Sequence, residues 1–156
     1  QMIGNHELTR HCIDKAIALN PNDVTVIRFA GQILSYLGDP EEGLKWKDRY
    51  LRVDPHFPTA VRESLVDILY MSRRYHGARL VRGWREAPPP MSCWLAAAAA
   101  QAGRMDEARE AAAEFWRRKP ETYSFKIFRT AHMRMCAHRA EIDLWLEGYG
   151  KAGLPV

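Results

Sequence analysis

Three side chains that could bind a metal ion lie close together near the carboxyl end of the chain: His132, Cys136 and His138. Imidazole and thiolate groups are good ligands for zinc. On one helix, however, Cys136 and His138 would point to different faces. No fourth ligand is evident nearby, and the spacing matches neither Cys-x-x-Cys nor Glu-x-x-His. We therefore expect no bound metal ion.

Acidic residues cluster at two places, Asp39 with Glu41 and Glu42, and Asp106 with Glu107. Such groups could serve metal-dependent chemistry if a fold brought them together. Both clusters instead fall where a helix is expected to begin, and acidic side chains are favourable at the positive end of a helix. We interpret them as helix-start signals.

The cysteines, Cys12, Cys93 and Cys136, are few and far apart in the sequence. Such a sparse, odd set fits a reducing compartment better than a disulfide framework. A nucleophilic thiol would need a base oriented by a third group, and none can be assigned. The sequence shows neither a secretion signal nor an apolar run long enough to span a membrane. We therefore predict a cytoplasmic chain with no catalytic residue, no cofactor and no membrane association.

The elements that would position any site follow from an internal period. Pro21, Pro55 and Pro89 are 34 residues apart, and each follows a stretch that is typical of a helix ending. This is the length of a tetratricopeptide unit, a pair of helices that must stack on its neighbours to bury its apolar faces. Apolar periodicity predicts helices over 5–19, 23–37, 40–53, 58–72, 74–86, 90–102, 105–118, 122–134 and 139–150.

The predicted fold class is therefore all-α, a right-handed tetratricopeptide-repeat superhelix of antiparallel helix pairs with a C-terminal capping helix. We expect a single domain over 1–156, divided into a partial unit 5–21, units 22–55, 56–89 and 90–120, and a cap 121–156. Gly38 and Gly103 occupy the turns of two units, whereas Arg73 occupies the turn of the third. The alanine run 96–100 predicts close helix packing. Because the first unit lacks its partner helix, we expect the chain to be a fragment of a longer protein.

Several motifs give this repeat a family resemblance. The strings are NPND (20–23), SYLGDPEEGLKW (35–46), AGRMDEAREAAAEFWRRKP (102–120) and above all the ending LEGYGKAGLPV (146–156). They resemble the C-terminal tetratricopeptide region of bacterial class III adenylate/guanylate cyclases, a type common in rhizobia-like bacteria, although Tyr149 and Gly150 depart from the family's ending. Related regions also occur behind winged-helix regulators. The resemblance implies a regulatory interaction arm of a signalling protein, with catalysis elsewhere.

Binding in such a superhelix normally uses the inner helix of each pair, whose exposed side chains line a concave groove. Here the inner helices are 23–37, 58–72 and 90–102. The repeat phase predicts a groove for a protein or peptide partner lined by Arg28, Gln32, Ser35, Tyr36, Glu63, Asp67, Tyr70, Trp94 and Gln101.

Two other functions stay open. The chain could be a homodimerisation or structural arm without an external ligand, because the first helix has no preceding hairpin to cover it. It could also be an accessory module of a DNA-binding regulator, since the net charge is +4 and the pI about 9.1. The arginines are scattered along the chain, which is typical of a solvated surface, so we expect no nucleic-acid binding.

Overall fold

The computed structural model describes residues 4–55, 59–77 and 89–156, although the side chains of 59–63 and 89–90 lie outside that description. The regular structure of these residues is helical, without a strand, so the predicted all-α class is confirmed. The helices are α1 (His6–Leu19), α2 (Val24–Tyr36), α3 (Pro40–Val53), α4 (Thr59–Met71), α5 (Pro89–Gln101), α6 (Met105–Arg118), α7 (Phe125–Met135) and α8 (Arg139–Lys151).

These bounds lie within three residues of those expected from periodicity. The exception is the helix predicted over 74–86, most of which lies outside the described residues. Its described beginning is a short 3₁₀ turn at 75–77 rather than α-helix. There the amide of Gly77 bonds to the carbonyl of Arg74, three residues back, at 2.9 Å.

Four helices, α2, α4, α5 and α8, end in the same kind of turn. Each is followed by a residue with positive φ: Gly38 (85°), Arg73 (58°), Gly103 (74°) and Gly153 (74°). The next amide then bonds to the carbonyl five residues earlier, as in Asp39 to Leu34 (3.0 Å), Arg74 to Leu69 (2.8 Å), Arg104 to Ala99 (2.9 Å) and Leu154 to Tyr149 (2.9 Å). This is the Schellman ending, which satisfies the last carbonyls of a helix and reverses the chain.

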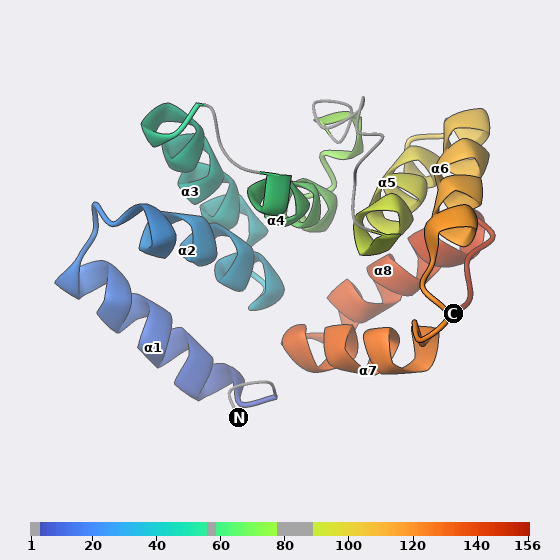
Figure 1. Cartoon of the computed structure of the whole chain (residues 1–156). Helices are drawn as coiled ribbons and strands as arrows, with labels where there is room; N and C mark the ends of the chain where they lie inside the picture. Colours follow the sequence, from blue (N-terminus) through green and yellow to red (C-terminus); the bar gives the residue numbers. More distant parts are fainter. Residues whose placement is uncertain (1–3, 56–58, 78–88) are drawn as a thin grey trace.

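Two helical hairpins follow from these turns. Helices α2 and α3 run in opposite directions side by side, and so do α5 and α6 (Figure 1). At the first crossing, a Cβ on Gly43 would lie 2.7 Å from the carbonyl oxygen of Gly31, so only glycine fits. In the second hairpin, the buried Ala108 lies in the first turn of α6, which packs against α5. Helix α4 lies between the hairpins and packs against α2, α3 and α5.

The core is divided unequally along the chain. Two small clusters, one around Ile27, Tyr50 and Leu65 and one around Ile13, Ala30 and Leu34, hold the N-terminal helices together. A much larger cluster joins α4, α5, α6 and α8, and it contains the alanine run 96–100, which is buried as the sequence predicts.

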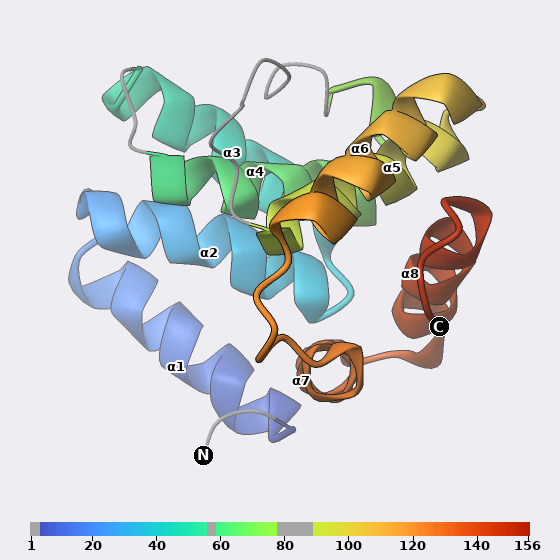
Figure 2. The ribbon, with the colours of Figure 1, turned by 45° about the vertical axis from the view of Figure 1, so that its right-hand side comes forward.

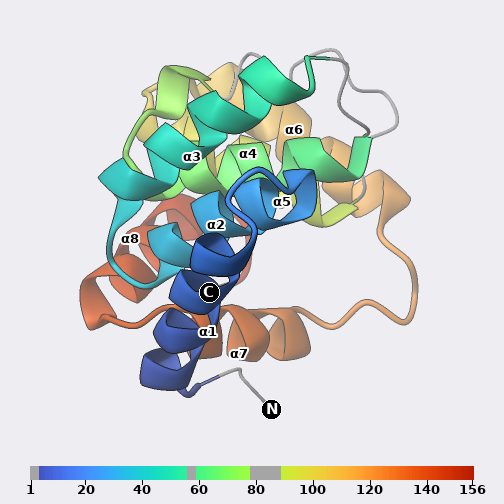
Figure 3. The same ribbon diagram turned by 90° about the vertical axis from the view of Figure 1, so that its left-hand side faces the viewer.

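The C-terminal helices turn back toward the start of the chain. Helix α8 packs along α5 and reaches α4, as expected of a helix that covers the last hairpin. Helix α7 extends further, because its end lies beside the beginning of α1 (Figures 2 and 3). There the imidazole Nε2 of His6 is 3.1 Å from the carbonyl oxygen of Arg134.

Candidate functional site

The inner sides of α2, α4 and α5 form one continuous surface, which we call the inner face. Four of its residues, Tyr36, Asp67, Tyr70 and Trp94, are at most 3% exposed. The side chains of Tyr36, Tyr70 and Trp94 contact α7 or α8 rather than solvent, and that of Asp67 bonds to residues of α2. Several of the predicted groove residues thus lie near one another, but the chain's own C-terminal helices cover them, and they do not line an exposed groove.

The first polar group on the inner face surrounds a buried carboxylate. Oδ2 of Asp67 accepts hydrogen bonds from the Tyr36 hydroxyl at 2.9 Å and from Nε2 of Gln32 at 2.8 Å. The Ser64 hydroxyl lies 3.4 Å from the amide oxygen of Gln32. A buried carboxylate requires such donors, because desolvation without them is costly. We call Gln32, Tyr36 and Asp67 the acidic cluster.

Tyr36 links this cluster to α7. Its hydroxyl is 3.2 Å from Nε2 of His132, so one oxygen lies between a carboxylate and an imidazole. Burial, and then the negative charge of Asp67, raise the pKa of Tyr36 well above its usual value. Tyr36 therefore remains a protonated hydroxyl that can donate to Asp67.

His132 itself lies among aromatic rings. Its imidazole is stacked on Trp145, with an interplanar angle of 5° and 5.3 Å between ring centroids, and its centroid is 5.1 Å from that of Trp94 and 4.5 Å from that of Phe128. Burial lowers the pKa of His132 to about 4. The imidazole is therefore neutral near pH 7.

The second polar group of the inner face contacts α8. The hydroxyl of Tyr70 donates to the carbonyl of Leu144 at 2.9 Å, and the ammonium group of Lys151 donates to the amide oxygen of Gln101 at 2.8 Å. A Cβ on Gly148 would collide with the ring and hydroxyl of Tyr70, so the glycine permits this approach. Trp94, between the two groups, contacts the rings of α8 as well.

Three predicted groove residues do not join these groups. The hydroxyl of Ser35 donates to the carbonyl of Gly31 at 2.9 Å, so Ser35 belongs to the crossing of α2 with α3. Arg28 is half-buried with its guanidinium 4.1 Å from the ring centre of Phe29. The side chain of Glu63 lies outside the described residues. Ser35 was misplaced because it precedes Tyr36, and one residue turns a helix by about 100°.

The turn between α7 and α8 is attached to the end of α2. The amide of Ala137 donates to the carbonyl of Tyr36 at 2.8 Å. The ring of His138 lies against Gly38, at a position where a Cβ would collide with it. Tyr36 thus contacts the C-terminal segment through both its hydroxyl and its carbonyl.

The suspected metal ligands are separated. His132 lies in the aromatic cluster, Cys136 is buried, and His138 is exposed. Burial raises the pKa of Cys136 to about 12, which leaves it a neutral thiol. Among the residues that the structure describes, no three histidine, cysteine or acidic side chains are grouped so that they could hold a metal ion.

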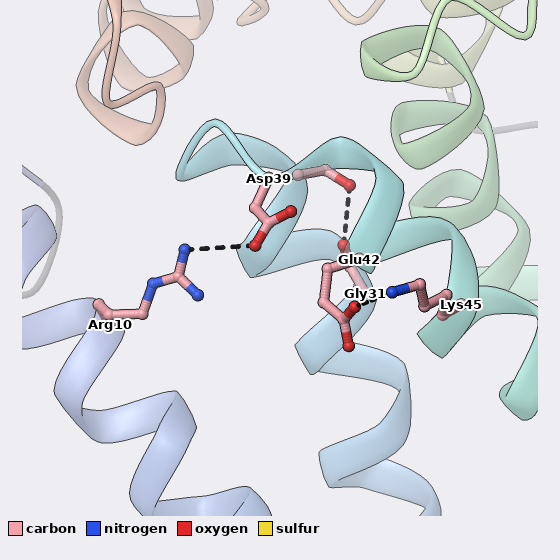
Figure 4. A network of polar contacts seen from close by, with 6 residues as sticks. Arg10, Gly31, Asp39, Glu42 and Lys45 are labelled. Carbon is pink, nitrogen blue, oxygen red and sulfur yellow. Dashed lines mark hydrogen bonds and ion pairs between the residues drawn. The ribbon is translucent and has the colours of Figure 1, made fainter.

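The acidic residues at the helix starts form ion pairs on the surface. Asp39 is 3.8 Å from a guanidinium nitrogen of Arg10, and Glu42 is 2.7 Å from the ammonium of Lys45 (Figure 4). Asp106 pairs with Arg109 at 2.8 Å in the first turn of α6. Their interpretation as helix-start signals is consistent with these positions at the beginnings of α3 and α6.

Comparison with known proteins finds no matching family model, no matching curated protein and no matching solved structure. None of the helices described is long and apolar enough to cross a membrane. The functional argument therefore depends on the geometry of the chain and on its sequence motifs.

Sequence reasoning expected the last helix, with Trp145 and Tyr149, to cover the final hairpin, but it did not foresee that α7 also packs there. Four residues of these two helices lie against the inner face. These are Phe128 and His132 on α7 and Trp145 and Tyr149 on α8. A signal was present, because each pair is four residues apart and so lies on one side of its helix. The spacing of apolar residues does not predict which surface these pairs pack against. The inner face thus binds α7 and α8 through ring packing and hydrogen bonds. Contacts of these kinds are also suited to binding a helix of another protein.

Proposed function

We propose that this chain is a scaffold of the tetratricopeptide type that binds a protein partner and has no catalytic role of its own. The observation that carries this proposal is the recurrence of one Schellman ending after α2, α4 and α5, at intervals close to a tetratricopeptide unit. The close crossing at Gly43 and the buried small residue Ala108 in the second hairpin support it, since stacked hairpins require small residues where helices cross.

We further propose that the partner belongs to class III cyclase signalling. The support is the resemblance of four motifs, the ending at 146–156 above all, to the C-terminal repeat region of those enzymes. In this arrangement the chain is an interaction arm, and the partner surface includes the inner face, which already accepts helices.

Mixing the chain with a purified class III cyclase catalytic domain tests this proposal. We expect a complex in light scattering and a changed cyclase rate. A chain with Asp67→Ala, which removes the carboxylate of the acidic cluster, serves as the matched control for inner-face binding. If the wild-type chain neither binds the domain nor changes its rate, the cyclase assignment is wrong.

A homodimerisation arm is the second candidate, and one observation favours it. Leu8 and Leu19 of α1 are 45% and 75% exposed, and Cys12 lies on the same exposed side of the helix. Light scattering over a wide range of concentrations distinguishes the two functions. A dimer that is lost with Leu8→Ser and Leu19→Ser would support the arm, whereas a monomer at every concentration would exclude it.

A further inference from the structure

Helix α7 covers the inner face without being buried itself. No residue of α7 is fully buried, and His132 is buried in part, whereas Tyr36 and Trp94 beneath it are fully buried. Its outward side carries Lys126, Ile127, Thr130 and Arg134, all exposed. Helix α7 is therefore a covering element that contributes a narrow strip of side chains, and not a part of the core.

The part of that strip near Trp94 and Trp145 consists of one aromatic ring and one imidazole, whereas Phe125 packs on Phe115 of α6. Phe128 has its ring centroid 6.1 Å from that of Trp145, and His132 contacts Tyr36, Trp94 and Trp145. The two residues are four apart, so they point in the same direction from the helix. An aromatic residue followed four positions later by histidine is thus the pattern that the inner face accepts.

The surface that receives His132 does not depend on α7 for its own structure. Oδ2 of Asp67 has both of its donors, Tyr36 and Gln32, on α2. The Trp94 and Trp145 rings are 6.2 Å apart, and Trp145 is 4.3 Å from Tyr149 within α8. None of these contacts includes a residue of α7, so we expect the site to stay formed for another occupant.

Departure of α7 alone would be unfavourable, because it would expose Trp94 and Trp145 to water. Replacement by a helix of the same pattern restores the ring packing and the hydrogen bond to Tyr36. Besides the ring contacts of Phe128 and His132, α7 would give up the packing of Phe125 on Phe115 of α6, the bond from Ala137 to the Tyr36 carbonyl and the contact of His6 with Arg134. Exchange is therefore the expected mode of access.

We propose that the inner face recognises a partner helix that carries an aromatic residue and, four positions later, a histidine, and that α7 is the built-in competitor for this site. The proposal rests on the scaffold function above and specifies the partner. It also assigns the acidic cluster the role of recognising the partner's imidazole, through the Tyr36 hydroxyl.

A synthetic, fluorescently labelled peptide of residues 119–138 is the probe that tests this proposal. The receiving protein is the whole chain with Phe128→Ser and His132→Ser, which removes the two competing side chains. We expect saturable binding with one peptide per chain, at least about tenfold tighter than to the wild-type chain. The matched control chain carries Lys126→Ser and Thr130→Ser on the outward side of α7 and should bind the peptide no better than wild type.

Two further measurements make the test specific. A peptide with the same Phe128→Ser and His132→Ser changes should not bind, and Tyr36→Phe in the receiving chain should weaken binding of the normal peptide. Equal binding of both peptides, or equal binding to the wild-type chain, would overturn the proposal. So would absence of binding to a receiving chain whose circular dichroism shows that it is folded.

Hydrogen exchange of the wild-type chain covers the case in which the receiving variant does not fold. The amides of α7 should exchange faster than those of α5 and α8. Exchange of α7 as slow as that of α5 would contradict a displaceable helix. Failure of the cyclase mixing experiment removes only the proposed partner class. Failure of peptide exchange removes the recognised helix pattern and the competitor role of α7, and leaves the scaffold function in place.

Discussion

The N-terminal and C-terminal halves of the chain are stabilised in different ways. In the N-terminal half, small clusters such as Ile27, Tyr50 and Leu65 join neighbouring helices, as expected of stacked repeats. Around the C-terminal helices, one large cluster includes rings from α2, α4, α5, α6 and α8, some of them far apart in sequence. The difference teaches that contacts between helices close in sequence explain the first half, whereas the second depends on helices that fold back over the earlier ones.

Loss of a ring from the large cluster should have the largest effect. Trp94 is 1% exposed and contacts the rings of Tyr70, His132, Trp145 and Tyr149. Trp94→Ala should lower the free energy of unfolding by roughly 3–5 kcal/mol in denaturant titration. Trp116→Ala, at a residue 48% exposed, is the control and should cost well under half as much. Similar losses would show that the cluster is not continuous.

Acid should weaken the C-terminal half through His132. Its pKa is about 4 in the folded chain against about 6.5 when unfolded. Because the folded value is the lower one, protonation favours unfolding, and stability falls as the pH drops below about 6.5. The loss attributable to His132 reaches about 3 kcal/mol near pH 4.

Comparison of the wild-type chain with His132→Gln isolates this contribution, because the carboxylates titrate in both. Unfolding free energies measured between pH 7 and pH 4 should decrease more steeply for the wild type. Parallel pH profiles for the two chains would mean that His132 is not buried in solution.

Substitution of the small residue in the second helix of each hairpin should lower the free energy of unfolding by different amounts. Gly43→Ala places a Cβ 2.7 Å from the Gly31 carbonyl oxygen and against Ser35, which should cost about 2 kcal/mol despite the better helix propensity of alanine. In the C-terminal hairpin, Ala108 is an alanine already, and Ala108→Gly should cost only about 1 kcal/mol. Thermal unfolding of both variants measures the difference, and a stabilising Gly43→Ala would refute the close crossing.

The smallest expected effect is a gain in the free energy of unfolding, from a substitution at the turn after α4. Arg73 has a φ of 58°, in the left-handed region that glycine adopts at the equivalent turns. Arg73→Gly should raise the free energy of unfolding by up to about 1 kcal/mol. The adjacent Arg74→Gly is the control and should give no gain. Loss of stability in Arg73→Gly would indicate that the arginine side chain makes a compensating contact.

The helices and their turns could be predicted because their causes are local. Gly38, Gly103 and the proline period determine where the chain reverses, and nearby apolar residues determine which side of each helix is buried. Even Arg73, without the usual glycine, was placed at its turn by the repeat length.

The candidate site could be predicted only in part. Tyr36 and Asp67 were expected on the inner face because repeat phase determines their direction. Their cover was not expected, since the contact of His132 with Tyr36 joins positions separated by 96 residues and leaves no periodic trace in the sequence. Ser35 was wrongly predicted to lie on the inner face with Tyr36. Adjacent residues of a helix point in different directions, and Ser35 lies at the crossing of α2 with α3.

The stacking of His132 on Trp145 has an optical consequence. Indole emission depends on the groups in contact with the ring, and here the contacting group belongs to the one helix that we expect to be exchangeable. Trp145 and Trp94 therefore form an internal fluorophore pair whose colour and intensity should change when α7 leaves. Unlabelled protein can thus report its own occupancy, without any probe being attached to the surface.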